Sequence, residues 1–398
     1  MLPQPATTAP LPPRLPDLPS PNFGPGTWND WLLTGFAQAV DAAMMRAMGM
    51  VVDAVLLPGP DEVAEMRAAA QRIIAAAPWR EPRRFFGFVD DDVRPLQSEG
   101  RRRRNLPGGQ VVARRFTTDY EPAAPTVGEA NLTDAVHVEH WLHDGEAPRT
   151  TVLALHGFSM GYPRFDGFAL FAADLYRAGF DIALLTLPAH GARTPPGARF
   201  SGEKFAMPRV DQLNEIVRQA VYEIHAIANW LRAHNGGAVG LLGLSLGGYL
   251  SALMAGLRDD WAFVVPMVPP VCIGDLAFRF HARSRRVQRT PELAFSRDEL
   301  RAAYRVHSPL AHPLLVPRER ILIVAGKGDR IVPPAHPHAL WEHWGNPQIH
   351  WYSGSHVAPL PRREIARRIV AHVSAAHADA PARADAPARA DAPEGSRQ

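Results

Sequence analysis

The stretch GLLGLSLGGYLSALM, residues 240–254, holds the pattern that decides the fold, a Gly-x-Ser-x-Gly centred on Ser245. The apolar residues before Ser245 are typical of a short buried strand, and those after it of a buried helix. A strand, a sharp turn and a helix in this order form a nucleophile elbow, in which the flanking glycines permit the turn and the serine hydroxyl is exposed. The pattern predicts that Ser245 is a nucleophile at the end of a strand.

Strand-like and helix-like segments alternate on both sides of this elbow. We expect strands over residues 111–120, 135–143, 150–155, 182–187, 239–242, 262–268, 321–325 and 348–351. We expect helices over residues 165–179, 210–234, 247–257 and 362–372. The first two strands are expected to form an antiparallel pair that precedes the parallel strands. The alternation predicts an α/β protein with a mostly parallel sheet covered by helices on both faces.

A serine hydroxyl is a weak nucleophile until a base takes its proton, and His356 is our candidate for that base. It follows the last predicted strand, where a parallel sheet presents its site. His350 lies inside that strand, whereas His336, His338 and His343 lie in or near a helix.

An acidic side chain should orient the imidazole, and two aspartates are placed to do so. Asp329 follows the predicted strand 321–325 and is the preferred candidate. Asp275 follows the strand before it and is the alternative, although it also suits the start of a helix.

Acyl transfer also needs donors for the oxyanion that develops in the transition state. The amide of Leu246, directly after the nucleophile, is one candidate. The amide of Phe158, in the His-Gly-Phe sequence that ends strand 150–155, is the other.

The segments LALHGF, LTLPAHG, GLSLGG, GKGDRIVP and GSH occur in this order. Over about residues 111–373 the chain therefore resembles the α/β-hydrolase superfamily of serine hydrolases. The resemblance implies an α/β-hydrolase fold with an eight-stranded, mostly parallel sheet, a Ser245–Asp329–His356 triad, and Phe158 and Leu246 as oxyanion donors. The sequence departs from many members at Thr186-Leu187, where an aspartate is usual.

By the same resemblance, the interruption at about 272–320 would be a helical cap over the site. We expect His156, Gly157, Leu276, Phe278 and Phe280 to contact substrate. A mobile lid and a fixed helical insertion both remain open, and Ser296-Arg-Asp-Glu299 predicts a capped helix start within the cap.

Four regions are expected along the chain. They are a proline-rich disordered arm (1–26), a mainly helical extension (27–108), the α/β-hydrolase domain (109–376), and a disordered Ala/Asp/Pro/Arg repeat tail (377–398). The extension should hold helices at 28–55 and about 61–76, whose methionines Met44, Met45, Met48 and Met50 either pack on the main domain or touch lipid or a partner. We interpret the run Arg101–Arg104 as a solvated loop, with contact to an anionic surface as the alternative.

Composition excludes several other classes. A net charge of +3, from 43 basic and 40 acidic residues, is too balanced for a nucleic-acid binder. The single cysteine, Cys272, excludes an intramolecular disulfide and a cysteine zinc site. In His137-Val-Glu139-His140 only the first and third side chains share a strand face, so no metal is expected. No secretory signal is visible, and we expect a cytoplasmic location.

The sequence thus predicts a serine hydrolase that cleaves a small-molecule carboxylic ester through an acyl-enzyme, with no metal or organic cofactor. The alternatives are a membrane-associated lipid hydrolase that docks through residues 27–57, a thioesterase or acyltransferase, and, less favoured, a peptidase or a non-catalytic binding relative. The oligomeric state stays open.

Overall fold

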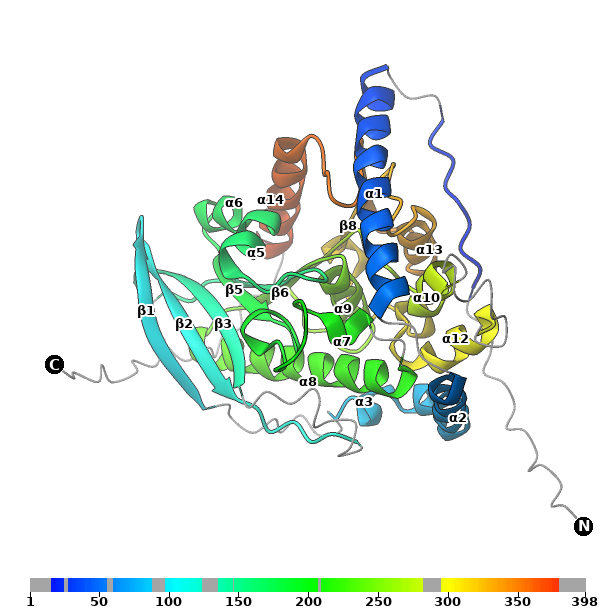
Figure 1. Cartoon of the computed structure of the whole chain (residues 1–398). Coiled ribbons are helices and arrows are strands. Elements are labelled where there is room, and N and C mark those ends of the chain that lie inside the picture. Colours follow the sequence, from blue (N-terminus) through cyan, green and yellow to red (C-terminus); the bar gives the residue numbers. More distant parts are fainter. Residues whose placement is uncertain are drawn as a thin grey trace, which may run out of the picture.

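A nine-stranded sheet organises the protein, as the computed structural model in Figure 1 shows. The structure describes residues 16–24, 28–55, 60–87, 97–123, 135–145, 147–206, 209–281 and 295–378. The strand order is β1-β2-β3-β5-β4-β6-β7-β8-β9. The strands are β1 Ser98–Leu106, β2 Gly109–Thr117, β3 Ala135–His143, β4 Thr151–Leu155, β5 Asp181–Thr186, β6 Val239–Leu244, β7 Val264–Met267, β8 Leu322–Gly326 and β9 Gln348–Tyr352.

The sheet has an antiparallel part and a parallel part. Strands β1, β2, β3 and β5 pair antiparallel. From β5 through β4, β6, β7 and β8 to β9 every pairing is parallel. The carboxyl ends of these parallel strands meet at one edge of the sheet, and the loops that leave them can converge on one site.

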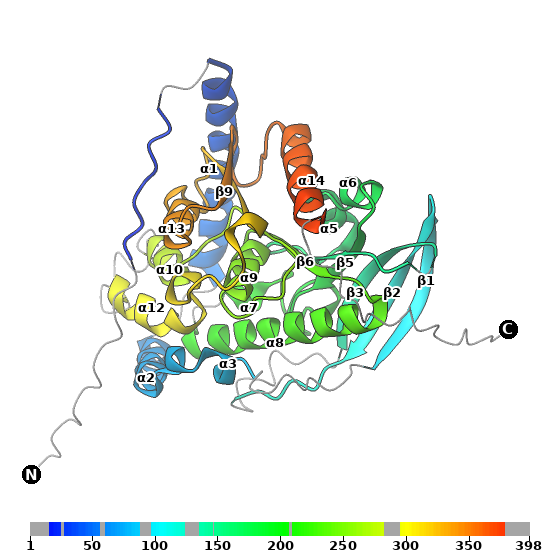
Figure 2. The ribbon, with the colours of Figure 1, turned by 180° about the vertical axis from the view of Figure 1, so that it is seen from behind.

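The central strands are apolar on both faces because helices cover both. Leu153 and Leu155 of β4 belong to one buried cluster with helices α8 (Val210–Asn235) and α9 (Leu246–Ala255). Val152 and Ala154 belong to a second cluster with α6 (Ala172–Arg177) and α14 (Arg362–Ala378). Successive side chains of β4 thus point to opposite faces, and both faces are apolar, as expected for a parallel strand that is covered by helices on both sides. Figures 1 and 2 show α5, α6 and α14 together, across the sheet from α8.

The expected helices are present with shifted ends, one of them is divided, and the short helices α3 and α7 were not expected. The helices are α1 Trp28–Val55, α2 Pro60–Ala76, α3 Pro82–Phe85, α5 Pro163–Ala169, α6 Ala172–Arg177, α7 Glu203–Ala206, α8 Val210–Asn235, α9 Leu246–Ala255, α10 Ile273–His281, α12 Arg297–Ala303, α13 Ala335–His343 and α14 Arg362–Ala378. The expected helix 165–179 is two helices, because Phe171 takes a left-handed conformation with φ 56° between them.

The prediction of eight strands is wrong by one, and the interpretation of Arg101–Arg104 as a loop is wrong with it. These arginines lie in β1, which pairs with β2 across a hairpin turn at Pro107-Gly108, where Gly108 has φ 67°. β1 is almost wholly exposed and forms the edge of the sheet. Charged side chains on an edge strand discourage pairing with another chain, which gives the run a structural role.

The amino-terminal segment is not wholly a free arm. Residues 16–24 have no regular secondary structure, yet the carbonyl of Pro16 accepts a hydrogen bond from Arg301, and Phe23 meets Trp351 edge-to-face with ring centroids 4.8 Å apart. The expected disorder of the rest of the arm and of the repeat tail concerns residues outside the described ones, except that α14 continues to Ala378.

The cap region packs against the amino-terminal helices. Ser296 and Glu299 form the predicted capping box at the start of α12. α12 contacts both α10 and α2, and the Arg67 guanidinium of α2 lies 5.1 Å from the centroid of the Phe295 ring. These contacts favour the fixed insertion for the α12 part of the cap; residues 282–294 lie outside the described residues.

Candidate active site

Ser245 stands at the junction of β6 and α9 in a conformation that L-residues rarely adopt, with φ 54° and ψ −109°. Its amide donates to the Met267 carbonyl at 2.9 Å, and its carbonyl accepts from the Tyr249 amide at 2.8 Å. A Cβ on Gly247 would lie 2.0 Å from the Leu155 carbonyl oxygen, so only glycine lets the helix start this close to β4. This is the geometry of the predicted nucleophile elbow.

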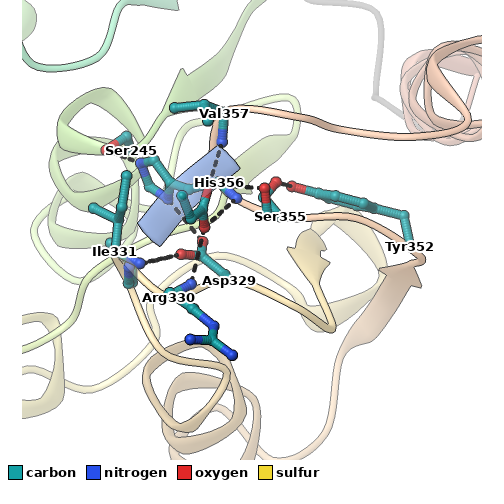
Figure 3. Close-up of polar contacts among 10 residues, drawn as sticks. Ser245, Asp329, Arg330, Ile331, Tyr352, Ser355, His356 and Val357 are labelled. Atoms are coloured by element: carbon teal, nitrogen blue, oxygen red, sulfur yellow. Dashed lines mark hydrogen bonds and ion pairs between the residues drawn. The ribbon is translucent and has the colours of Figure 1, made fainter. Parts of the chain in front are cut away.

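His356 and Asp329 lie beside this serine, as Figure 3 shows. The Ser245 hydroxyl is 2.8 Å from His356 Nε2, and His356 Nδ1 is 2.7 Å from Asp329 Oδ2. Asp329 follows β8 and His356 follows β9, so the three side chains come from the carboxyl ends of three parallel strands. The structure thus brings together all three preferred triad residues.

Asp329 is fixed in place by backbone donors. Its Oδ1 accepts from the amides of Ile331 at 2.9 Å and Val332 at 2.7 Å, which leaves Oδ2 to His356. Burial raises the pKa of Asp329, while His356 and the Val332 amide pull it down. The alternative acid, Asp275, binds Arg297 instead, and the structure shows no hydrogen bond from it to His356 among the described residues.

His356 combines burial with negative neighbours. Burial lowers its pKa, but the charges of Asp329 and Asp41, with the Asp329 hydrogen bond, outweigh burial and hold the pKa above the ordinary value of 6.5. A neutral His356 that donates from Nδ1 to Asp329 has Nε2 free to accept the serine proton. The arrangement can therefore activate Ser245 as a nucleophile.

The two expected oxyanion donors flank the serine. Leu246 is the first residue of α9, directly after Ser245. Phe158 follows Gly157, whose added Cβ would lie 3.5 Å from the Ser245 Cβ, so the loop after β4 passes close to the nucleophile. Their amides remain the candidates for this role.

His156 supports the loop after β4 with both ring nitrogens. Its Nδ1 donates to the Gly157 carbonyl at 2.8 Å, and its Nε2 accepts from the Leu187 amide at 3.0 Å. Burial lowers its pKa to about 3, so the ring stays neutral. These bonds leave neither nitrogen for a substrate, and we replace the expected substrate contact of His156 with a supporting role.

The expected substrate contacts of the cap lie on α10. Leu276, Phe278 and Phe280 are half-buried there. Phe278 also packs against the buried cluster around α8 and α9, and its contact with substrate stays a prediction. Leu276 and Phe280, four residues apart, share a different face of α10 and remain candidates.

One residue of the site was missed by the sequence reasoning. Asp41 of α1 is fully buried and accepts hydrogen bonds from the loop that carries His356. The available signal was that Asp41 lies in the middle of the mostly apolar run 28–55, where a charged side chain that is buried needs hydrogen-bonding partners.

Two absences among the described residues bear on other functions. No group of three or more His, Cys, Asp or Glu side chains within them is placed to hold a metal ion. Of the helices found there, none combines the length and apolar character needed to cross a membrane.

Solved structures with this arrangement of elements include two esterases. Acetyl xylan esterase 1 from Thermoanaerobacterium sp. superposes with a TM-score of 0.54 at 16% identity, over 75% of this chain and 94% of that one. An acetyl xylan esterase from Paenibacillus sp. gives 0.50 at 17% identity, over 74% and 92%. The chain therefore has the α/β-hydrolase fold, with Ser245 at the turn between β6 and α9.

Similarities in sequence agree with this fold. Residues 128–273 match a family model described as alpha/beta hydrolase domain containing 18. Uncharacterised proteins from two strains of Mycobacterium tuberculosis are 33% identical over 243 residues, which is 59% of this chain and 56% of each relative. The match therefore spans little more than half the length of these curated relatives.

Proposed function

We propose that the protein is a serine hydrolase that cleaves a carboxylic ester through an acyl-enzyme. The observation that carries this proposal is the unbroken hydrogen-bonded chain from Ser245 through His356 to Asp329. Such a chain at a nucleophile elbow makes the serine hydroxyl reactive at neutral pH.

The reaction follows from the geometry in two halves. The Ser245 Oγ attacks the ester carbonyl while His356 Nε2 takes its proton, and the Phe158 and Leu246 amides bind the oxyanion. His356 then gives this proton to the departing alkoxide, which leaves as the alcohol. Water, deprotonated by His356, attacks the acyl-enzyme, and the collapse of that intermediate releases the acid and returns the proton to Ser245.

A labelling experiment with a fluorophosphonate probe tests the nucleophile. The wild-type protein should be labelled, and Ser245→Ala should lose both the label and the hydrolysis of p-nitrophenyl esters. Ser251→Ala is the matched control, because this serine lies on α9 and bonds to the Gly248 carbonyl. Labelling that persists in Ser245→Ala would overturn the assignment.

Acyl specificity is measured with p-nitrophenyl esters from short to long chains, beside a thioester and a peptide. We expect the highest kcat/KM on one of the oxygen esters. A clear preference for the thioester would favour a thioesterase, and the absence of turnover and of labelling would favour a binding protein.

A second candidate, a lipid hydrolase that docks on membranes, is favoured by exposed aromatic residues at the carboxyl edge of the sheet. Trp31 and Phe36 of α1 are 71% and 65% exposed. Phe165 and Phe168 of α5, the helix that follows β4, are also exposed. Large apolar side chains at this density on a surface mark interaction sites.

Flotation with liposomes tests this candidate. If α1 docks on lipid, the wild-type chain should float with liposomes that contain anionic lipid, and Trp31→Ser with Phe36→Ser should float several-fold less. Leu315→Ser is the control, since Leu315 is an exposed apolar residue outside these helices. A wild-type protein that stays with the soluble fraction would exclude lipid docking through α1.

A further inference from the structure

The Asp41 carboxylate is the hydrogen-bond acceptor for two loops at once. Its Oδ2 accepts from the amides of Arg330 at 2.9 Å and His356 at 3.1 Å. Its Oδ1 accepts from the Ser355 hydroxyl at 2.7 Å and the Val357 amide at 3.2 Å. Four donors around one fully buried side chain are what an ionised carboxylate requires.

These donors are neighbours of the catalytic groups. Arg330 follows Asp329 directly, and Ser355 and Val357 flank His356 on either side. The carboxylate therefore joins the loop of the triad acid to the loop of the triad base, and Figure 3 shows these loop residues gathered around His356. A displacement of either loop would lengthen the contacts between Asp329, His356 and Ser245.

Helix α1 contacts the loops that carry Asp329 and His356 through a polar face. Asp30 accepts a hydrogen bond from Ser353, and Gln38 accepts one from the Arg330 guanidinium at 3.1 Å. Close approach is possible because a Cβ on Gly328 would lie 2.7 Å from Thr34 Cγ2. Hydrogen-bond geometry, more than apolar burial, sets where this face of α1 lies.

We infer that Asp41 is a positioning residue, supplied by the amino-terminal helix, that holds the acid and base loops of the site in the geometry needed for proton transfer. The inference rests on the proposed function. It adds to the triad a fourth side chain that does not touch the substrate and acts through His356 and Asp329.

The charge of Asp41 also reaches the imidazole. Asp329 and Asp41 are the two carboxylates that raise the pKa of His356 against the lowering effect of burial. Tyr352, in β9, stays neutral because burial holds its pKa well above 10, and the Arg330 guanidinium is directed to Gln38. Removal of the Asp41 charge should therefore lower the pKa of His356.

The test compares Asp41→Asn with the wild type. Asparagine keeps the shape but offers one acceptor oxygen and turns an NH₂ group toward two of the donors. We expect kcat for an ester to fall about 10- to 100-fold, with KM changed little, and the acid limb of kcat/KM to move to lower pH. Asp30→Asn is the matched control, because it also removes a negative charge from α1, while Asp30 bonds to Ser353 and not to the neighbours of Asp329 and His356. The pH at which kcat/KM falls on the acid side should be unchanged in this variant.

A titration of the His356 ring by NMR separates this inference from the proposed function. The ring signals are assigned by their loss in His356→Asn, and circular dichroism checks that each variant is folded. A lower His356 pKa in Asp41→Asn than in both wild type and Asp30→Asn would support positioning, even in a protein that hydrolyses no tested ester. An unchanged His356 pKa, or wild-type kcat in Asp41→Asn, would overturn it.

If Asp41→Asn fails to fold, Ser355→Ala provides the second test. This variant removes only one of the four donors to Asp41. We expect a smaller fall in kcat and an unchanged KM, and a variant with full wild-type kcat would count against the inference.

Discussion

Ser245 is held where an L-residue is strained, and the surrounding residues maintain that strain. Positive φ at a non-glycine residue costs on the order of 1–3 kcal/mol. The amide and carbonyl of Ser245 are both bonded, to Met267 and Tyr249, so the elbow cannot relax without the loss of two buried hydrogen bonds. The strain projects the hydroxyl towards His356.

Protonation of His356 should govern the pH dependence of activity. A protonated His356 cannot accept the Ser245 proton, so kcat/KM is lost as pH falls through its pKa. Because Asp329 and Asp41 together hold that pKa above the ordinary value, the acid limb should lie above pH 6.5. Asp329→Asn should lower kcat by about 10⁴-fold, the size seen when a triad aspartate is replaced in serine proteases, and move the acid limb to lower pH.

The measurement is kcat/KM for one ester from pH 5 to 9, in wild type and Asp329→Asn. Asp275→Asn is the control, because Asp275 binds Arg297 and not His356. Its kcat/KM should fall at low pH in the same range as that of the wild type. An acid limb that moves in Asp275→Asn and stays in Asp329→Asn would reverse the assignment of the acid.

Among the secondary-structure elements, the sequence predicts those whose residues show a regular apolar pattern bounded by turn residues. The strands from β2 to β9, the long helices that separate them and both long amino-terminal helices lie close to their expected ranges, whereas the short helix α7 was not expected. β1 was missed because charged residues on both faces hide the alternation of an edge strand, although Pro107-Gly108 marks the hairpin turn. The three residues of the proposed triad could be found in the sequence because each follows a recognisable buried strand.

The contacts of α1 were beyond sequence reasoning for a physical reason. Local pattern gives the apolar face of a helix, and apolar faces normally pack inward. In α1 the docked face carries Asp30, Gln38 and Asp41, and their partners lie about 290 to 325 residues away in the chain. The pairing of polar groups so far apart in the sequence leaves no periodic signal.

For the whole molecule, buried neutral histidines link stability to pH. Burial lowers the pKa of His156 and His307 to about 3, and of His190 and His336 to about 4. In the unfolded chain these side chains bind a proton near pH 6.5, whereas in the folded chain they do not. The unfolded state therefore binds more protons below pH 6.5, and stability falls as pH decreases from there towards 4.

Urea unfolding at pH 7.5 and pH 5.5 measures this effect. Each such histidine can lower the free energy of unfolding by at most about 1.4 kcal/mol per pH unit. His336→Asn should reduce the slope, because the amide oxygen can replace the Nδ1 acceptor for the Val271 amide without binding a proton. Equal stability at both pH values would contradict the assignment of these rings as neutral.

The bond between Asp41 and His356 also bears on the order in which the chain acquires its activity. During synthesis α1 emerges early, and its partner loop emerges only after the strands of the sheet have been made. Closing so long a loop carries an entropic cost that local contacts do not. Asp41 can therefore make these hydrogen bonds only after residues 330–357 have been synthesised, so the site is completed by a contact between two distant parts of the chain.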